Sequence, residues 1–351
     1  MLRTKNSDRH YFLLEKIAPV TIFLCLIFIN PFLSRADDSE KTKAVNQQLN
    51  MFESSLRESP NVHPERPSAG AMLKDFLSPE LSLAPPGPKS VSNVKTRVHN
   101  LDAGSEIFYS RYQEPGVGVK IYGPMYGYYA DYAYRPADPN FFNNFLTNVY
   151  MMQARYASSR DLDYKGSGII KGKHDDAMEF RGLIGKDYFI GTDSRVTPYF
   201  GFGYRYLFDH GNGHLSSTNH YAYDRKSHYY YLPLGGDVII DMPKNWEMDF
   251  NVEYDIFLQG KQKSFLSNGF RFNGFHNPDL ANWQDHGFGI RGSIKFLKRG
   301  SAMDFYVEPY IRYWNIDQSK SQTAVVDGSL GTFVEPKNNT TEVGSKFGIQ
   351  F

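Results

Sequence analysis

The sequence contains almost no cysteine and only one long apolar run. Cys25 is the sole cysteine among 351 residues, and it lies inside the apolar run at 17–33. The rest of the chain can therefore form no disulfide bond within itself. A helical membrane span needs about 20 apolar residues, and no later stretch of this chain, whose mean hydropathy is -0.49, reaches that length. These absences exclude a disulfide-rich scaffold and a bundle of membrane-spanning helices.

Neither sign of charge dominates the chain. The 39 Lys and Arg residues balance 38 Asp and Glu residues, giving a formal net charge of +1, so nothing favours a nucleic-acid partner. The chain also lacks a Gly-x-Ser-x-Gly motif, a glycine-rich phosphate loop and a Cys/His cluster with metal-ligand spacing. We therefore expect no catalytic chemistry, no cofactor and no metal site.

The amino-terminal segment has the pattern of a secretory signal peptide. Basic residues precede the apolar run at 17–33, and Ser34-Arg35-Ala36 follows it with small residues at the first and third positions. This pattern predicts a signal peptide over 1–36 that is cleaved near Ala36. A membrane anchor is the alternative, although the run is short and is interrupted by Pro19 and Pro31.

The segment at 37–100 lacks any regular alternation of apolar and polar residues. It is polar and rich in proline, a composition that is typical of flexible, largely disordered chain. We expect it to form a periplasmic extension that precedes a folded domain at 101–351.

From residue 105 onward, the sequence repeatedly alternates between apolar and polar residues. The segment 246–258 is the clearest case, because it places Trp246, Phe250 and Ile256 on one face and Glu253 and Asp255 on the other. This period of two belongs to a β-strand and not to a helix. Alternation and turn residues together predict about ten strands, near 105–114, 119–135, 149–164, 176–190, 195–209, 227–241, 246–260, 286–297, 302–317 and 340–351.

The connections between these strands alternate between short turns and long loops. Short turns occur at 191–194, 243–245 and 298–301, and the predicted long loops are 165–175, 210–226, 261–285 and 318–339. Membrane β-barrels have short periplasmic turns and longer extracellular loops. The connection from 136 to 148 is long for a periplasmic turn, so eight or twelve strands are also compatible with the pattern.

The final segment, from Val343 to Phe351, alternates up to the carboxyl end and closes on Phe351. It resembles the terminal strand of small Gram-negative outer-membrane β-barrel proteins. The resemblance implies an all-β, antiparallel transmembrane β-barrel in the outer membrane, surrounded by outer-membrane lipid. It also implies that Phe351 serves as a signal for the barrel assembly machinery. A soluble β-sandwich or lipocalin-like barrel is the competing fold, since alternation alone does not assign the inner face.

The polar faces of the predicted strands carry charges of both signs. A barrel of ten strands leaves at most a narrow passage, and mixed charges favour ion pairs inside it. We expect either a lumen filled by ion pairs or a narrow pore for small solutes or ions. The candidate lining residues are Arg205, Glu253, Asp255, Arg291, Glu308 and Arg312. Binding through the outer loops, as in an adhesin, is the alternative function.

A more distant alternative is an outer-membrane protease similar to the omptins. Such enzymes use acidic pairs and an Asp-His pair, and the nearest candidates here are His174-Asp175-Asp176 and Asp209-His210. Adjacent residues of a strand point to opposite faces, so these pairs depart from the omptin pattern. The spacing of His214, His220 and His228 matches no compact metal motif.

Overall fold

A computed structural model describes residues 96–137, 147–268 and 277–351. The predicted signal peptide at 1–36 lies outside the described residues, as does the predicted extension up to residue 95. Most of the connection after Pro136 lies outside them too.

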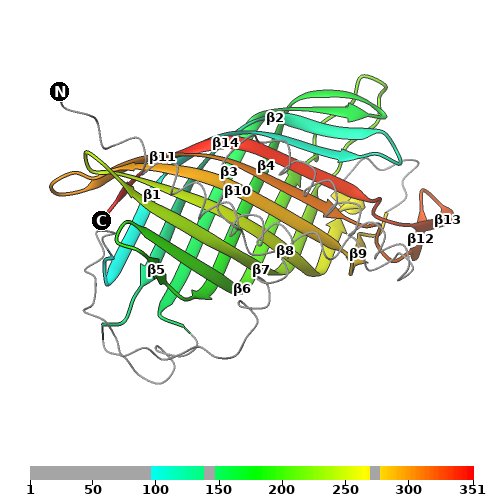
Figure 1. Ribbon diagram of the computed structural model, residues 1–351. Helices are drawn as coiled ribbons and strands as arrows, with labels where there is room; N and C mark the ends of the chain where they lie inside the picture. Colours follow the sequence, from blue (N-terminus) through cyan, green and yellow to red (C-terminus); the bar gives the residue numbers. More distant parts are fainter. Residues whose placement is uncertain (1–95, 138–146, 269–276) are drawn as a thin grey trace, which may run out of the picture. The chain divides into compact units, whose positions relative to one another are not determined.

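Ten antiparallel strands form a closed barrel (Figure 1). Sequential neighbours pair along the wall, β8 pairs with β10, and β14 pairs with both β11 and β1, which completes the ring. The ring strands are β1 (His99–Glu114), β2 (Val119–Tyr134), β3 (Val149–Gly166), β4 (Gly168–Gly185), β6 (Ser194–His210), β7 (Arg225–Met242), β8 (Trp246–Ser264), β10 (Gly287–Lys298), β11 (Asp304–Ile316) and β14 (Asn338–Gln350).

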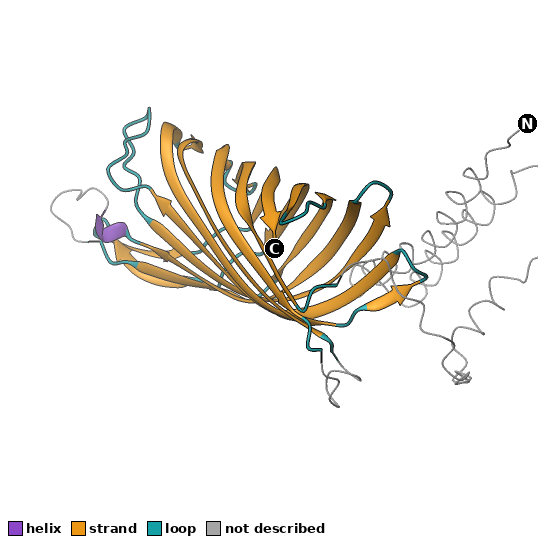
Figure 2. Cartoon of the chain, turned by 90° about the vertical axis from the view of Figure 1, so that its left-hand side faces the viewer, coloured by secondary structure: helices purple, strands orange, loops and turns teal. Residues whose placement is uncertain are grey.

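Shorter elements lie at the two ends of the barrel. Strand β5 (Tyr188–Ile190) pairs with the start of β6, and β9 (Leu280–Gln284) pairs with the end of β8. Strands β12 (Gln322–Val326) and β13 (Ser329–Phe333) form a separate hairpin, and the 3-10 helix η2 spans Leu266–Asn268 (Figure 2). Within the described ranges, no helix has the length and apolar character needed to cross a membrane.

The two ends of the barrel differ, and we name them by their connections. The turn end holds the start of β1, the end of β14 and the tight turn between Met242 and Trp246, in which Lys244 and Asn245 have positive φ angles of 64° and 60°. The loop end holds the connections at 211–224, 265–286 and 317–337.

One predicted loop is wrong. Residues 165–175 form no long loop, because β3 and β4 continue to a tight hairpin in which Gly166 pairs with Gly168. Gly168 has a φ of 135°, a conformation that side chains other than glycine rarely adopt. Two smaller differences are that the first strand begins at His99 and that the predicted strand at 176–190 divides into β4 and β5.

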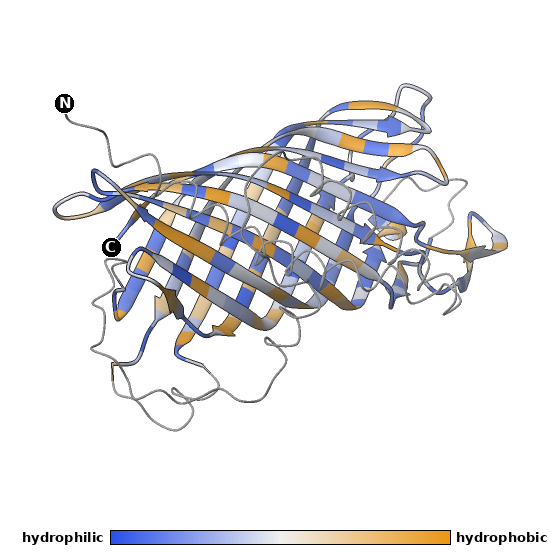
Figure 3. Ribbon diagram, in the orientation of Figure 1, coloured by the Kyte–Doolittle hydropathy of each residue, from blue (hydrophilic) through white to orange (hydrophobic). Residues whose placement is uncertain are grey.

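The side chains on the two faces of the wall have the distribution of a membrane protein. Phe180, Phe202 and Phe305 are exposed on the outer face, whereas alternate positions place charged residues inside. Figure 3 shows this alternation as orange and blue blocks along each strand. A soluble barrel would turn its apolar face inward, so the outward apolar surface confirms the predicted transmembrane β-barrel.

Candidate functional site

Five of the six predicted lining residues are buried inside the lumen. The exposed fractions are 3% for Arg205, 1% for Glu253, 0% for Asp255, 6% for Arg291 and 8% for Arg312. The sixth residue, Glu308, is half-buried. The structure therefore brings the five buried residues together inside the barrel, where neighbouring side chains cover them.

The first group of ion pairs converges on Glu342 of β14. Its carboxylate lies 2.9 Å from Arg155 of β3, 2.8 Å from Arg205 of β6 and 3.4 Å from Arg312 of β11. Glu106 of β1 adds a second carboxylate, which pairs with Arg155 and Arg312. Residues from five strands thus meet across the lumen.

The second group converges on Arg291 of β10. Its guanidinium lies 2.6 Å from Glu179 of β4, and its Nε lies 3.1 Å from Glu253 and 2.7 Å from Asp255 of β8. The hydroxyl of Tyr231 donates a hydrogen bond of 2.7 Å to Glu179. Here too, contacts cross from one side of the barrel to the other.

Aromatic rings fill the space between the two groups of charges. The rings of Tyr231 and Trp314 meet edge to face, with centroids 5.0 Å apart and an interplanar angle of 74°. The Trp314 ring lies beside both Arg205 and Arg291, at 5.4 and 5.6 Å. Tyr231 occupies space next to Gly203, where a Cβ atom would overlap its ring. The absence of a side chain at Gly203 therefore makes room for the Tyr231 ring.

These charged and aromatic residues form what we call the dividing layer. Its members are Glu106, Arg155, Glu179, Arg205, Tyr231, Arg291, Arg312, Trp314 and Glu342. A cavity of about 190 Å³ lies at the turn end, lined in part by Asp102, Asp249 and Lys295. A smaller cavity of about 70 Å³ lies at the loop end, lined in part by Tyr112 and Asp209. Arg291 and Arg312 line the first cavity, whereas Arg205 and Glu342 line the second.

Glu308 faces the turn-end cavity, outside the dividing layer. It lies 3.4 Å from Lys346, and Lys295 donates a hydrogen bond of 2.5 Å to Asp102 nearby. Mixed signs of charge therefore favour pairing at this end as well.

A third charged group lies at the loop end of the lumen. Glu335, in the connection between β13 and β14, accepts a hydrogen bond of 3.2 Å from Tyr112 and lies 3.8 Å from Arg225. Burial raises the pKa of Glu335 to about 7, and the neighbouring carboxylate of Glu114 acts in the same direction, whereas Arg225 opposes the rise. The carboxyl group of Glu335 therefore titrates near neutral pH.

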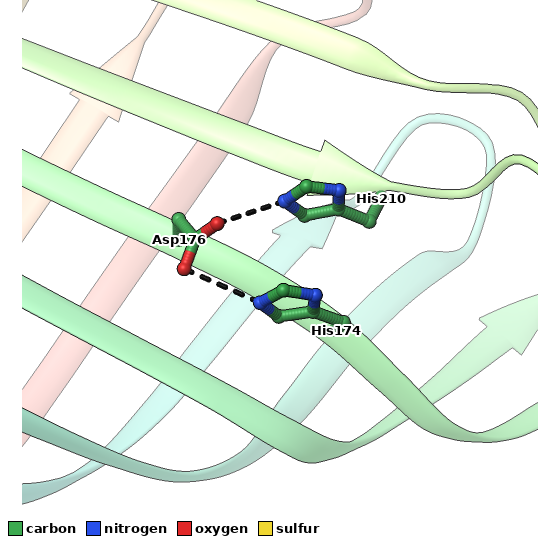
Figure 4. Close-up of side chains that lie close together, drawn as sticks. All are labelled: His174, Asp176 and His210. Carbon is green, nitrogen blue, oxygen red and sulfur yellow. Dashed lines mark hydrogen bonds and ion pairs between the residues drawn. The ribbon is translucent and has the colours of Figure 1, made fainter.

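The protease candidates are separated by the barrel wall. The predicted loop at 165–175 would include His174 and Asp175, but both residues lie within β4, as does Asp176. His174, Asp176 and His210 group together on the outer face (Figure 4), whereas Asp175 and Asp209 face the lumen and share Lys173. The two histidines therefore belong to a different face from the paired Asp175 and Asp209 carboxylates.

The sequence analysis missed several members of the dividing layer as site residues. Glu342 lies on the polar side of the terminal strand, two positions before Gly344 and four before Lys346, so its inward direction was readable from alternation. Trp314 comes two positions after Arg312, so alternation places it on the same polar face. An aromatic ring suits either face of a membrane barrel, so neither Trp314 nor Tyr231 stood out as a site residue.

No family model matches the chain, and no curated protein matches it significantly. Solved structures similar to it include the outer membrane protease OmpT from Escherichia coli, with 8% identity and a TM-score of 0.48, covering 72% of this chain and 96% of that one. The translocator domain of the autotransporter NalP from Neisseria meningitidis shares 9% identity at a TM-score of 0.35, covering 72% and 88%. Ail, the attachment invasion locus protein of Yersinia pestis, shares 11% at 0.25, covering 73% and 100%.

These likenesses are too distant to carry an argument about function. The class of protein follows instead from the closed antiparallel ring and its outward apolar surface, which together define an integral outer-membrane β-barrel.

Proposed function

We propose that this barrel is closed to solutes in its resting state and acts as a structural and surface-interaction protein of the Gram-negative outer membrane. In this proposal the turn end faces the periplasm and the loop end faces the exterior, with outer-membrane lipid around the wall. It has no catalytic role. Phe351, whose side chain is exposed at the end of the chain, serves as the signal for the assembly machinery.

The dividing layer is the observation that supports closure. Arg291 and Glu342 each pair with groups from other strands across the lumen. Removing one partner from a buried ion pair leaves an uncompensated charge, at a cost of about 3–5 kcal/mol. Opening a passage would separate several such pairs at once, so the closed arrangement is strongly favoured.

Planar bilayer recordings test this proposal. The full-length protein, purified from membranes, should insert without producing discrete conductance steps. A triple variant with Arg205→Ala, Arg312→Ala and Trp314→Ala removes bulk from the dividing layer and should produce discrete conductance steps. These steps would also show that the recording detects inserted protein. Discrete steps from the parent protein, with ion selectivity altered by Glu308→Gln, would establish the pore instead.

Organised loops favour the surface-interaction part of the proposal. The β12–β13 hairpin is fastened to the 265–286 connection, because Gln322 accepts a hydrogen bond of 3.0 Å from the Ala281 amide and Asp327 accepts one of 2.8 Å from Asn277. The hairpin exposes Val325 and Leu330. A fixed apolar tip at the loop end is suited to contact with a surface.

The hairpin also offers a test that leaves the ring intact. Replacing 322–333 by a short Gly-Ser turn should reduce attachment of expressing cells to a hydrophobic surface, while the protein keeps its heat-dependent shift in detergent gels. Val325→Ser with Leu330→Ser should have the same effect, and Lys337→Ser, which changes an exposed residue outside the hairpin, is the control. Unchanged attachment after the replacement would remove this role.

A further inference from the structure

Three potential metal ligands lie together on the outer face of the wall near the loop end. In the antiparallel register His174 of β4 is directly opposite His210 of β6. Asp176 is two residues from His174 on the same strand, so its side chain shares that face. The side chains are partly open to the exterior, with exposed fractions of 30% for His174, 29% for His210 and 15% for Asp176.

The two imidazole rings direct the same atom toward one carboxylate (Figure 4). His174 Nε2 lies 3.3 Å from Asp176 Oδ1, and His210 Nε2 lies 2.8 Å from Asp176 Oδ2. The rings stack with their centroids 4.1 Å apart and an interplanar angle of 4°. As a result, each residue offers one potential ligand atom, and these three atoms lie within 4.8 Å of one another.

These distances suit an ion held between the three side chains. Zinc binds histidine nitrogen and carboxylate oxygen at about 2.0–2.2 Å. Two ligands at that distance and at a tetrahedral angle are therefore roughly 3.4 Å apart. The distance from His174 Nε2 to Asp176 Oδ1, 3.3 Å, lies close to this value, whereas the 2.8 Å from His210 Nε2 to Asp176 Oδ2 would have to lengthen. Binding would therefore require rotation of the side chains.

Strand β3 supplies a supporting contact on each side of the group. The hydroxyl of Tyr156 donates a hydrogen bond of 2.9 Å to Asp176 Oδ1, which fixes the orientation of the carboxylate. Ser158 Oγ lies 3.2 Å from His174 Nε2. The Tyr156 bond is of the kind that orients ligands at metal sites, whereas Ser158 contacts the same Nε2 atom that would bind an ion.

The same contacts also describe a plain hydrogen-bonded cluster, in which each histidine donates an Nε2 proton to Asp176. In that arrangement both imidazoles share a single carboxylate, and the two rings stay stacked with their centroids 4.1 Å apart. An ion between the three side chains would bind each imidazole in the tautomer that carries its proton on Nδ1, which leaves Nε2 free as a ligand atom. Imidazole nitrogen suits zinc and copper well, whereas magnesium and calcium prefer ligand sets made of oxygen.

We propose that His174, Asp176 and His210 bind one divalent late first-row transition metal ion on the outer face of the barrel. Zn²⁺ and Cu²⁺ share this ligand chemistry, and Cu²⁺ binds the more tightly of the two in a given site. Because the ligands come from β4 and β6, the ion ties two neighbouring strands together near the loop end. This proposal is independent of whether the lumen conducts.

Metal titration of the full-length protein in detergent micelles tests the proposal. After treatment with a chelator and its removal, calorimetric titration with Zn²⁺ and with Cu²⁺ should each show one ion per chain. His174→Ala and His210→Ala should each weaken binding by about 100-fold or more, and Asp176→Asn by at least about 10-fold. In the Cu²⁺ form, electron paramagnetic resonance should show coupling to two imidazole nitrogens.

The chain offers matched control histidines. His228 lies on the outer face of β7 and is hydrogen-bonded to Tyr204, and His214 and His220 lie in the 211–224 connection. Replacing each of these three by Ala should leave binding unchanged. The change in gel mobility on heating shows that a variant is folded. If His174→Ala or His210→Ala does not show this change, His174→Gln or His210→Gln takes its place.

Two results would overturn the proposal. One is that the ion occupies another site. Binding that persists in both His174→Ala and His210→Ala would show this, and so would binding that disappears in the control variants. The other is no calorimetric signal from either ion above that of the His174→Ala/His210→Ala double variant, which would leave the group as a hydrogen-bonded cluster.

Discussion

The two ends of the lumen are built from the same strands but are filled differently. The cavity at the turn end measures about 190 Å³ and gathers ionisable groups such as Asp249 and Lys295, whereas the cavity at the loop end measures about 70 Å³ and is lined partly by Ile121, Met125 and Tyr229. The dividing layer lies between them. Similar alternation therefore produces a larger, charged cavity in one half and a more tightly packed interior in the other, depending on side-chain volume and on ion-pair partners across the barrel.

The largest expected difference is in the free energy of unfolding, between a variant that loses a carboxylate of the dividing layer and one that loses a carboxylate of the turn-end cavity. Glu342→Gln leaves Arg155, Arg205 and Arg312 without their shared counter-charge and should lower the free energy of unfolding by about 3–5 kcal/mol. Asp249→Asn should change it by less than about 1 kcal/mol, because Asp249 Oδ1 has no hydrogen-bond partner among the described residues. Urea titration in detergent measures both. Equal losses would show that the two halves do not differ in this way.

A medium effect is expected from the packing of the dividing layer. Gly203→Ala places a methyl group where the Tyr231 ring lies and should cost about 1–3 kcal/mol. Gly182→Ala on the neighbouring strand is the control, since nothing lies within 4 Å of its added Cβ. The same urea titration compares the two variants, and a Gly203→Ala protein as stable as Gly182→Ala would contradict the tight packing.

An effect that depends on pH is expected at the loop end. Burial raises the pKa of Glu335 to about 7 in the folded protein, compared with about 4.3 in an unfolded chain. The folded state thus favours the protonated carboxyl, so its contribution to stability is complete below about pH 4.3 and is lost as the pH rises to about 7. The contribution falls by at most about 1.4 kcal/mol per pH unit.

Glu335→Gln removes this titration and should flatten the change in unfolding free energy between pH 5 and 7. The advantage of the variant over the parent protein should therefore grow as the pH rises. Lys337→Ser, two residues further along, is the control and should keep the parental slope. Parallel curves for Glu335→Gln and the parent protein would show that Glu335 titrates in the ordinary acidic range.

Period-two alternation predicted most of the fold, because a strand in lipid must alternate wherever its two faces meet different surroundings. It failed at 165–175, where Lys171, Lys173 and His174 are polar on both faces. The ring strands are 12 to 19 residues long, and a membrane crossing needs only about 9–11. The strands therefore continue where lipid no longer imposes a pattern.

The candidate sites were less predictable than the wall that carries them. The inward direction of Arg205 and Glu253 follows from alternation, but their partners depend on which strands face one another across the lumen. The group on the outer face required the register of β4 and β6, which places His174 opposite His210 across 36 residues of sequence. The roles of the signal peptide, of the segment at 37–95 and of Phe351 stay predictions.

The pairing of β1 with β14 also has a consequence for biogenesis. Asp102 lies opposite Gln350, and Gln113 lies opposite Asn339, so the first and last strands of the ring supply each other's hydrogen bonds. Until the carboxyl-terminal residues leave the ribosome, β1 has an unpaired edge of the kind that promotes aggregation. Contacts this distant in sequence also form slowly. This edge of β1 therefore stays open until β14 pairs with it, and the ring closes only when that thirteen-residue strand is in place.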